Sequence, residues 1–167
     1  TTLDLAEAKA GALRIDRNPV DFSDVVRRLV DIYHPAMAER RHQVTSDIEG
    51  HVVVDADLSL LHRVVSNLLE NELTHLPDGC QVSIRLHSDP RSAELVIEDN
   101  GPGFPPEIGN RAFERFVKGK HSSGHGLGLA FVDAVVQAHG GVARVSDRAG
   151  GGAVITLSLP VSLLQAA

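Results

Sequence analysis

Cysteine, aromatic residues and long hydrophobic runs are all scarce in this chain of 167 residues. Its one cysteine, Cys80, cannot form an internal disulfide, which favours a reducing, cytoplasmic setting. Tryptophan is absent and aromatic residues make up 4% of the sequence, so surfaces that stack nucleic-acid bases are not expected. No apolar run approaches the ~20 residues of a membrane-spanning helix. The first residues are acidic where a secretion signal would be basic and then apolar.

Basic residues are also in the minority. The 16 lysines and arginines face 22 aspartates and glutamates, a formal net charge of −6. This balance argues against nucleic acid or an anionic membrane as a partner, although it allows one anion at a local site. A composition of 43% hydrophobic and 23% charged residues is typical of a soluble globular protein, and the length suits one domain.

Hydrophobic periodicity predicts alternating helices and strands. The expected helices cover 1–12 (the end of a helix), 23–40 with Ser23 as N-cap, 57–76 and 127–138. The expected strands cover 44–49 and 51–55 on either side of Gly50, then 81–87, 93–98, 142–145 and 153–159, with 14–20 as a connector. This order predicts a two-layer α/β sandwich with a mixed sheet.

The helix expected over 57–76 carries a group of polar residues: Asn67, Glu70, Asn71, Thr74 and His75. Asn67 and Asn71 are four residues apart and therefore share a helix face. Amide and carboxylate oxygens suit Mg²⁺, which needs one or two protein oxygens when a ligand supplies phosphates. The alternative interpretation is an ordinary solvent-facing helix surface.

Three loops complete the candidate site. Asp99-Asn100-Gly101-Pro102-Gly103 follows a strand, so that a carboxylate stands beside bare backbone that a flat ring can approach; the alternative is a simple turn. Gly124-His125-Gly126-Leu127-Gly128 leads into a helix and could cradle phosphate, or act only as a hinge. Lys118 and Lys120, two of only three lysines, lie just before it, in a loop that could equally be plain solvated surface.

Taken in order, NLLENELTHLP, DNGPG, FERF, GHGLGLAFVDAVVQAHGG and GGGAVITLSLP resemble the catalytic and ATP-binding domain of bacterial sensor histidine kinases. This domain belongs to the Bergerat-fold ATPase superfamily, shared with gyrase, Hsp90 and MutL. The resemblance covers about residues 20 to 161. It implies a mixed, largely antiparallel sheet of about five strands plus a small N-terminal strand pair, backed by three helices.

The resemblance also implies roles for individual residues. Asn71, with Asn67 beside it, would hold Mg²⁺ against the phosphates of ATP or ADP, and Asp99 would bind the adenine amino group. Glu70 is the nearest candidate to orient or deprotonate the incoming histidine. The remaining nucleotide-binding residues that we expect are His75, Gly101, Gly103, Phe113, Arg115, Lys118, Lys120, Gly124, His125, Gly126, Leu127, Gly128 and Thr156, and Arg115 would also act on the phosphate during transfer.

The chain departs from the pattern of these kinases at two positions. Glu72 stands where alanine is usual, and Thr74 stands where a phosphate-binding lysine is usual. Because Glu72 follows Asn71 directly, we expect its side chain to face away from the site. Both departures leave open a degenerate module of the same fold that serves as a regulatory scaffold. A serine-directed kinase or an ATPase is a further alternative, although Asn67 stands where gyrase-type ATPases have a glutamate base.

The resemblance finally divides the chain. Residues 1–17 are expected to be the end of a dimerisation helix with its connector, 18–162 the ATP-binding domain, and 163–167 a tail. The phosphoacceptor histidine motif of the family is missing, so the acceptor would lie in a dimerisation and histidine-phosphotransfer domain outside this monomeric fragment. This domain would lie in the cytoplasm, and its parent protein would be a homodimer, with the option of an anchor in the inner membrane and with a response regulator as its partner.

Overall fold

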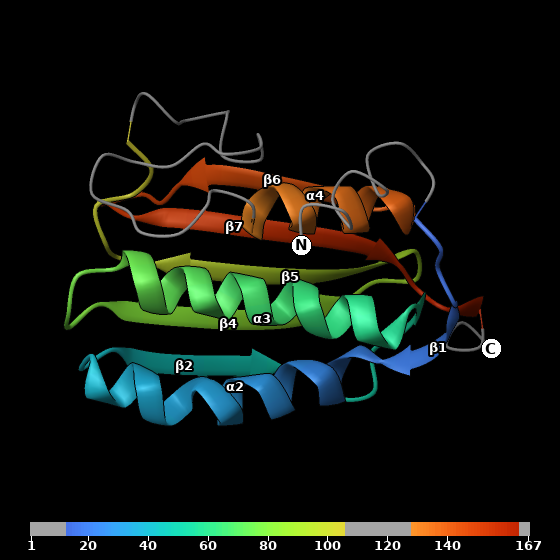
Figure 1. The fold of residues 1–167 in the computed structure, drawn as a ribbon, viewed down its shortest axis with the longest axis horizontal. Helices are drawn as coiled ribbons and strands as arrows, with labels where there is room; N and C mark the ends of the chain where they lie inside the picture. The colour runs from blue at the N-terminus through green and yellow to red at the C-terminus, as the bar shows by residue number, and fades with distance from the viewer. Residues whose placement is uncertain (1–12, 106–127, 164–167) are drawn as a thin grey trace.

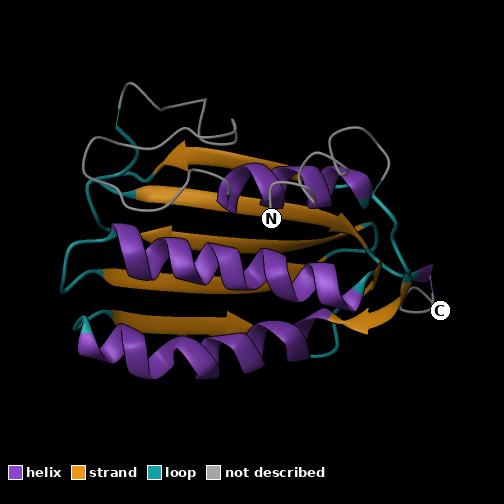
Figure 2. Ribbon diagram, viewed as in Figure 1, coloured by secondary structure: helices purple, strands orange, loops and turns teal. Residues whose placement is uncertain are grey.

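A computed structural model of the protein describes residues 13–105 and 128–163. Its helices lie together on one face of a five-stranded sheet, which confirms the expected two-layer sandwich (Figure 1, Figure 2). The helices are α2 (Phe22–Glu39), α3 (Leu58–His75) and α4 (Gly128–Ala138). The strands are β1 (Asn18–Asp21), β2 (Gln43–Ile48), β3 (Val53–Ala56), β4 (Gln81–Ser88), β5 (Ser92–Asp99), β6 (Val142–Asp147) and β7 (Ala153–Pro160).

The main sheet has the order β2-β4-β5-β7-β6 and is largely antiparallel, since only β2 and β4 run parallel. Alternate residues of β5 and β7 are buried against the helices, and the residues between them lie on the uncovered face. The hairpin between β4 and β5 closes at Asp89, whose amide donates to the carbonyl of Ser92. The hydrophobic core therefore fills the space between the helices and one face of the sheet.

The small second sheet differs in its strands from the sequence-based prediction. The two strands expected around Gly50 belong to different sheets: β2 is an edge of the main sheet, and β3 pairs with β1. The expectation of a connector over 14–20 was wrong for its last residues, which form most of β1. This strand has four residues and buries only Val20, so its sequence shows no alternation that could reveal it.

The start of α2 also differs from the expectation. Asp21, not Ser23, is the N-cap, because its side chain accepts a hydrogen bond from the amide of Asp24. Ser23 is buried instead, where its hydroxyl donates to the carbonyl of Glu49 and accepts from the amide of Val52. It therefore fastens α2 to the turn that leads into β3.

A buried histidine sets the relation between α3 and α4. Asp57 caps α3 by accepting a hydrogen bond from the amide of Leu60. The amide of Asp57 itself donates to Nε2 of His139, which follows α4, at 3.1 Å. The two helices are therefore antiparallel, and the end of α3, the end of β5 and the start of α4 lie toward the same side of the molecule (Figure 1). None of the described helices is long and apolar enough to span a bilayer.

Candidate functional site

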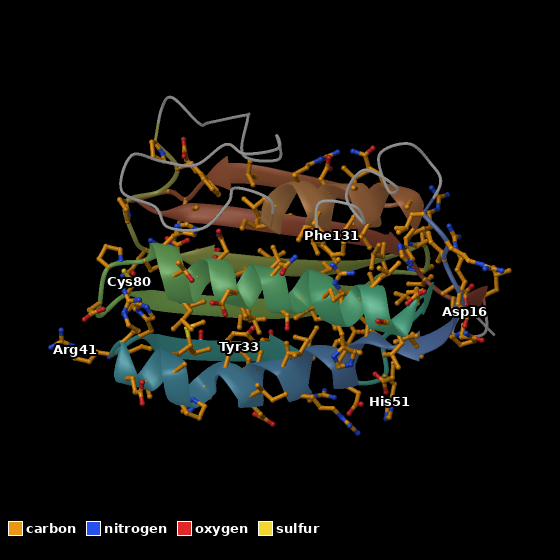
Figure 3. The ribbon with its side chains drawn as sticks, viewed as in Figure 1. Asp16, Tyr33, Arg41, His51, Cys80 and Phe131 are labelled. Atoms are coloured by element: carbon orange, nitrogen blue, oxygen red, sulfur yellow. The ribbon has the colours of Figure 1, made fainter. Side chains whose placement is uncertain are left out.

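The asparagines of the candidate site lie on the flank of α3 that faces α4. Arg63, Asn67 and Asn71 are spaced four residues apart, so they share one flank of the helix. The Arg63 guanidinium lies 4.3 Å from the ring centre of Phe131 on α4, which shows where this flank points (Figure 3). Both asparagines are half-buried. The predicted shared face is therefore confirmed.

Asp99 ends β5 on the helix-covered side of the sheet. Its side chain follows the same alternation as the buried Leu95 and Ile97, and the residue is only 5% exposed. Its Oδ1 accepts a hydrogen bond from the amide of Gly101 at 2.8 Å. The loop that follows thus holds a buried carboxyl group in a fixed position at the end of the strand.

Glycines surround Asp99 at close range. A Cβ added at Gly101 would lie 2.6 Å from the Leu76 side chain and 3.1 Å from Asp99 Oδ1. A Cβ added at Gly152 would overlap the carbonyl of Asp99, and Gly152 has a φ of +112° that side chains disfavour. Two separate segments therefore pack bare backbone closely around Asp99, and a side chain at either glycine would displace its neighbours.

Glu72 lies beside Asp99, which corrects the expectation that it faces away. The residue is 2% exposed, and its carboxyl group is within hydrogen-bonding reach of that of Asp99. The prediction failed because it considered only the offset from Asn71. Leu61, Val65 and Leu68 recur at spacings of four and three residues, and the next steps of four residues lead through position 72 to Leu76. That stripe was the signal that could have found Glu72.

Burial and crowding of carboxyl groups shape the electrostatics here. Burial raises the pKa of Glu72 well above its usual range, and the neighbouring Asp99 raises it further. The pKa of the Cys80 thiol is also raised, first by burial and then by Asp99 and Glu72. Figure 3 places Cys80 at the end of the molecule where α3 gives way to β4. This end of the core therefore holds two neighbouring carboxyl groups that are both buried.

Other predicted residues lie at varying distances from this centre. Gly128 is the exposed first residue of α4, where backbone amide groups of the first turn have no partner within the helix. His75 is the last residue of α3, and partial desolvation lowers the pKa of its imidazole. Thr156 pairs with Val96 on the uncovered face of the sheet, opposite to Asp99, so the structure does not bring these two together. The remaining predicted residues, Phe113, Arg115, Lys118, Lys120, Gly124, His125, Gly126 and Leu127, lie outside the described part of the chain.

The uncovered face of the sheet has a pocket of its own. Gln43, Thr45, Gln81, Val82, Ser83, Glu98, Asp99, Asn100 and Arg148 line it. Glu98 accepts hydrogen bonds there from Arg85 at 3.2 Å and from Arg148 at 2.8 Å, so both arginines pair with the Glu98 carboxylate. Asp99 is the only predicted site residue in that lining, and the candidate site is therefore placed on the helix side.

The donor set on α3 fits Mg²⁺. Among the described residues, no group of three or more histidines, cysteines, aspartates and glutamates could hold a metal by itself. Glu70 is exposed and Asn71 half-exposed, so both can reach a hydrated ion. A metal held by Asn71 would complete its shell with water and ligand phosphates, as Mg²⁺ commonly does.

Solved histidine kinase structures share this architecture. The mycobacterial sensor histidine kinase MprB superposes with a TM-score of 0.77 at 36% identity, over 87% of this chain and 98% of that one. Full-length ShkA in complex with AMPPNP superposes with a TM-score of 0.82 at 25% identity, over 96% of this chain and 34% of that one. The fold is thus that of a histidine kinase catalytic domain.

Comparison of the sequence with known families and proteins identifies the family to which the chain belongs. The family described as "Histidine kinase-, DNA gyrase B-, and HSP90-like ATPase" matches residues 56–163, well over half of the chain. The chain belongs to this family and is the ATPase-type domain of a sensor histidine kinase. "Probable sensor histidine kinase TcrY" of Mycobacterium tuberculosis is 39% identical over 142 residues, which cover 81% of this chain. The match spans about 30% of that relative's own length.

Proposed function

We propose that this chain binds ATP with Mg²⁺ and transfers the γ-phosphoryl group to a histidine of a dimerisation domain outside it. The observation that carries the proposal is the buried carboxyl group of Asp99, approached by the glycine backbone of two segments, beside the asparagine flank of α3. Membership of the family supports ATP as the ligand, and so does the AMPPNP bound to ShkA.

Each group has a part in the proposed reaction. Asp99 accepts a hydrogen bond from the exocyclic amino group of adenine, while Gly101 and Gly103 admit the flat ring. Asn71 holds Mg²⁺ against the phosphates with help from Asn67, and Glu70 orients the incoming histidine. The start of α4 contributes its positive dipole end, together with the basic and glycine-rich residues expected over 115–128.

In-line phosphoryl transfer needs positioning and neutralisation of charge more than covalent catalysis. Asn67 offers no carboxylate base for water, so transfer to a histidine is favoured over hydrolysis. We further propose that the parent protein is a homodimer and that a response regulator receives the phosphoryl group. Both partners are inferred from the sensor histidine kinases to which the chain is related.

Calorimetric titration with Mg-ADP tests the nucleotide site. Because a hydrogen bond to a charged group would be lost, Asp99→Ala is expected to weaken binding by about ten- to a hundredfold. Asn71→Ala is expected to weaken binding and to remove most of its dependence on Mg²⁺. Asp47→Ala, which removes an exposed carboxylate from β2, is the matched control and should bind as the wild type does.

A folded wild-type chain that binds no Mg-ADP would contradict the proposal. Addition of a separately produced dimerisation domain from a related kinase, with Mg-ATP, tests the transfer step. Acid-labile, base-stable phosphate on that domain is the expected product. Steady release of inorganic phosphate without any phosphohistidine would instead indicate an ATPase.

A further inference from the structure

Glu72 is a buried acid that the proposed chemistry does not use. It lies on the apolar stripe of α3, is 2% exposed, and approaches the Asp99 carboxyl group across the end of β5. Its Oε2 atom has no hydrogen-bond partner among the described residues. Buried polar atoms are nearly always paired, so an unpaired one beside a binding site points to a missing partner.

No ion pair with another described residue explains the burial of Glu72. Asp99 is the one charged group that acts on its carboxyl within the described residues, and that charge has the same sign. Arg40, which follows α2, is a cation on a neighbouring element at this end of the molecule. It acts on the Cys80 thiol and is hydrogen-bonded to Asp78 and to the carbonyls of Leu73 and Leu76. Within the described residues Glu72 therefore balances no positive charge, and an ordinary structural role leaves its unpaired oxygen unexplained.

We propose that Glu72 is a specificity-determining residue of the nucleotide site, whose carboxyl group contacts the edge of the base next to the amino group bound by Asp99. This inference rests on the proposed function. The Asp99 carboxylate accepts a hydrogen bond from the amino group, and the Glu72 carboxyl group, in its protonated form, donates to the neighbouring ring nitrogen N1, which is an acceptor in adenine. Since alanine is usual at this position in the kinases that the sequence resembles, this chain has an additional polar contact to the base.

The chemistry of the pair favours adenine over a base with a carbonyl in place of the amino group. Adenine presents an N–H donor to Asp99. Hypoxanthine presents an oxygen to Asp99 with no hydrogen atom between the two oxygens, and its ring nitrogen N1 carries a hydrogen and so cannot accept a hydrogen bond from Glu72. A site that hydrogen-bonds a substrate group discriminates strongly against an analogue that lacks it, because its own buried polar groups are left unpaired.

Titration of the full 167-residue chain with ADP and with inosine diphosphate tests the inference. Magnesium is held constant, so that the shared phosphate and metal contacts cancel in the ratio of the two affinities. Glu72→Ala is expected to weaken ADP binding about three- to tenfold, the size of one lost hydrogen bond, and to lower the ADP preference by a similar factor. Glu72→Gln, which keeps the shape and the hydrogen-bonding capacity, should retain the preference within about twofold.

Glu94→Ala is the matched control, because Glu94 lies exposed on the other face of β5 and should leave both affinities unchanged. An unchanged ADP preference in Glu72→Ala would overturn the inference. Tighter ADP binding by Glu72→Ala than by the wild type would also overturn it, since Glu72 would then only obstruct the site. In either case the proposed function stands. Failure of all folded variants and of the wild type to bind ADP would instead remove the proposed function and the inference with it.

Discussion

The buried polar groups at the two ends of α3 differ in whether they have hydrogen-bond partners. At its N-terminal end His139 is 4% exposed and both ring nitrogens are paired: Nδ1 lies 2.8 Å from the carbonyl of Val135, and Nε2 accepts from the amide of Asp57. Near its C-terminal end Glu72 Oε2 has no partner among the described residues. The same holds for Nε2 of His42, whose Nδ1 accepts from the amide of Cys80.

This difference suggests a structural role for the N-terminal end of α3 and a ligand-binding role for its C-terminal end. The histidine end joins α3, α4 and the connector, where Arg17 donates to the carbonyl of Ala138 and the amide of Asp16 to Asp57. A fully satisfied network of this kind fixes a single packing arrangement. The acidic end, with Glu72 and Asp99, keeps unsatisfied groups and close glycine backbone, which stabilise nothing by themselves. We therefore expect changes at the first end to alter stability alone, and changes at the second end to alter binding, with or without an accompanying change in stability.

The largest expected effect comes from Gly152→Ala at the acidic end. The new methyl group would overlap the Asp99 carbonyl, at a φ that alanine disfavours. We expect a loss of at least about 3 kcal/mol in the free energy of unfolding, and at least tenfold weaker ADP binding, from backbone strain and displacement of Asp99. Urea denaturation and calorimetry measure the two quantities.

Gly150→Ala is the control for Gly152→Ala. Gly150 also has a positive φ, of +88°, but open space surrounds its would-be Cβ. We expect it to cost about 1 kcal/mol of stability and no ADP affinity. Equal effects of the two substitutions on binding would show that backbone strain, not proximity to Asp99, governs the site.

At the histidine end, His139→Ala should affect stability alone. It removes a buried ring and leaves the amide of Asp57 without its partner, for an expected loss of about 2 to 3 kcal/mol in the free energy of unfolding. ADP affinity should remain within twofold of the wild type. His87→Ala, at an exposed position on β4, should change neither quantity. A large loss of ADP affinity in His139→Ala would contradict the claim that the end of α3 around His139 serves stability and not binding.

A smaller effect of opposite sign is expected from Glu72→Gln. The folded protein raises the pKa of Glu72, so ionisation of this group opposes folding once the pH rises above the ordinary value for glutamate. The amide cannot ionise, and the variant should be about 1 to 2 kcal/mol more stable than the wild type near pH 8. Denaturation at pH 4 should show little difference. A variant that is less stable at both pH values would contradict this account.

The smallest expected effect is the pH dependence contributed by His139. Burial, followed by the charge of Arg17, lowers its pKa in the folded state, so the unfolded chain binds the proton more readily. Stability should therefore fall by roughly 1 kcal/mol as the pH decreases from 7.5 through the ordinary histidine range. The stability gap between the wild type and His139→Ala should narrow over the same interval. A constant gap would show that His139 does not titrate there.

Much of the fold could be predicted because long amphipathic helices and strands show a clear hydrophobic periodicity in the sequence. The helix over 57–76, the hairpin from 81 to 98 and the last strands all lie close to their expected positions. The short strands could not be predicted in the same way. β1 buries one residue, and the pairing of β3 with β1 depends on contacts that no local pattern encodes. The N-cap of α2 was misplaced because both Asp21 and Ser23 suit that position.

The candidate site was predictable where residue type and spacing coincide, as for Asp99 and for the asparagines of α3. It was not predictable where tertiary packing decides. Glu72 was judged by its neighbour Asn71, although the helix stripe places it in the core beside Asp99. Thr156 matched a motif, but the two-residue period of β7 turns it toward the uncovered face.

Amide chemical-shift changes on addition of Mg-ADP test most directly the claim that ligand binding belongs to one end of α3. We predict the largest changes at 67–75, 99–103 and 152, around the Glu72 and Asp99 carboxyl groups, with little change at 56–58 and 135–140 around His139. Changes centred on His139, or saturating binding that leaves Gly101 and Gly152 unmoved, would contradict the account.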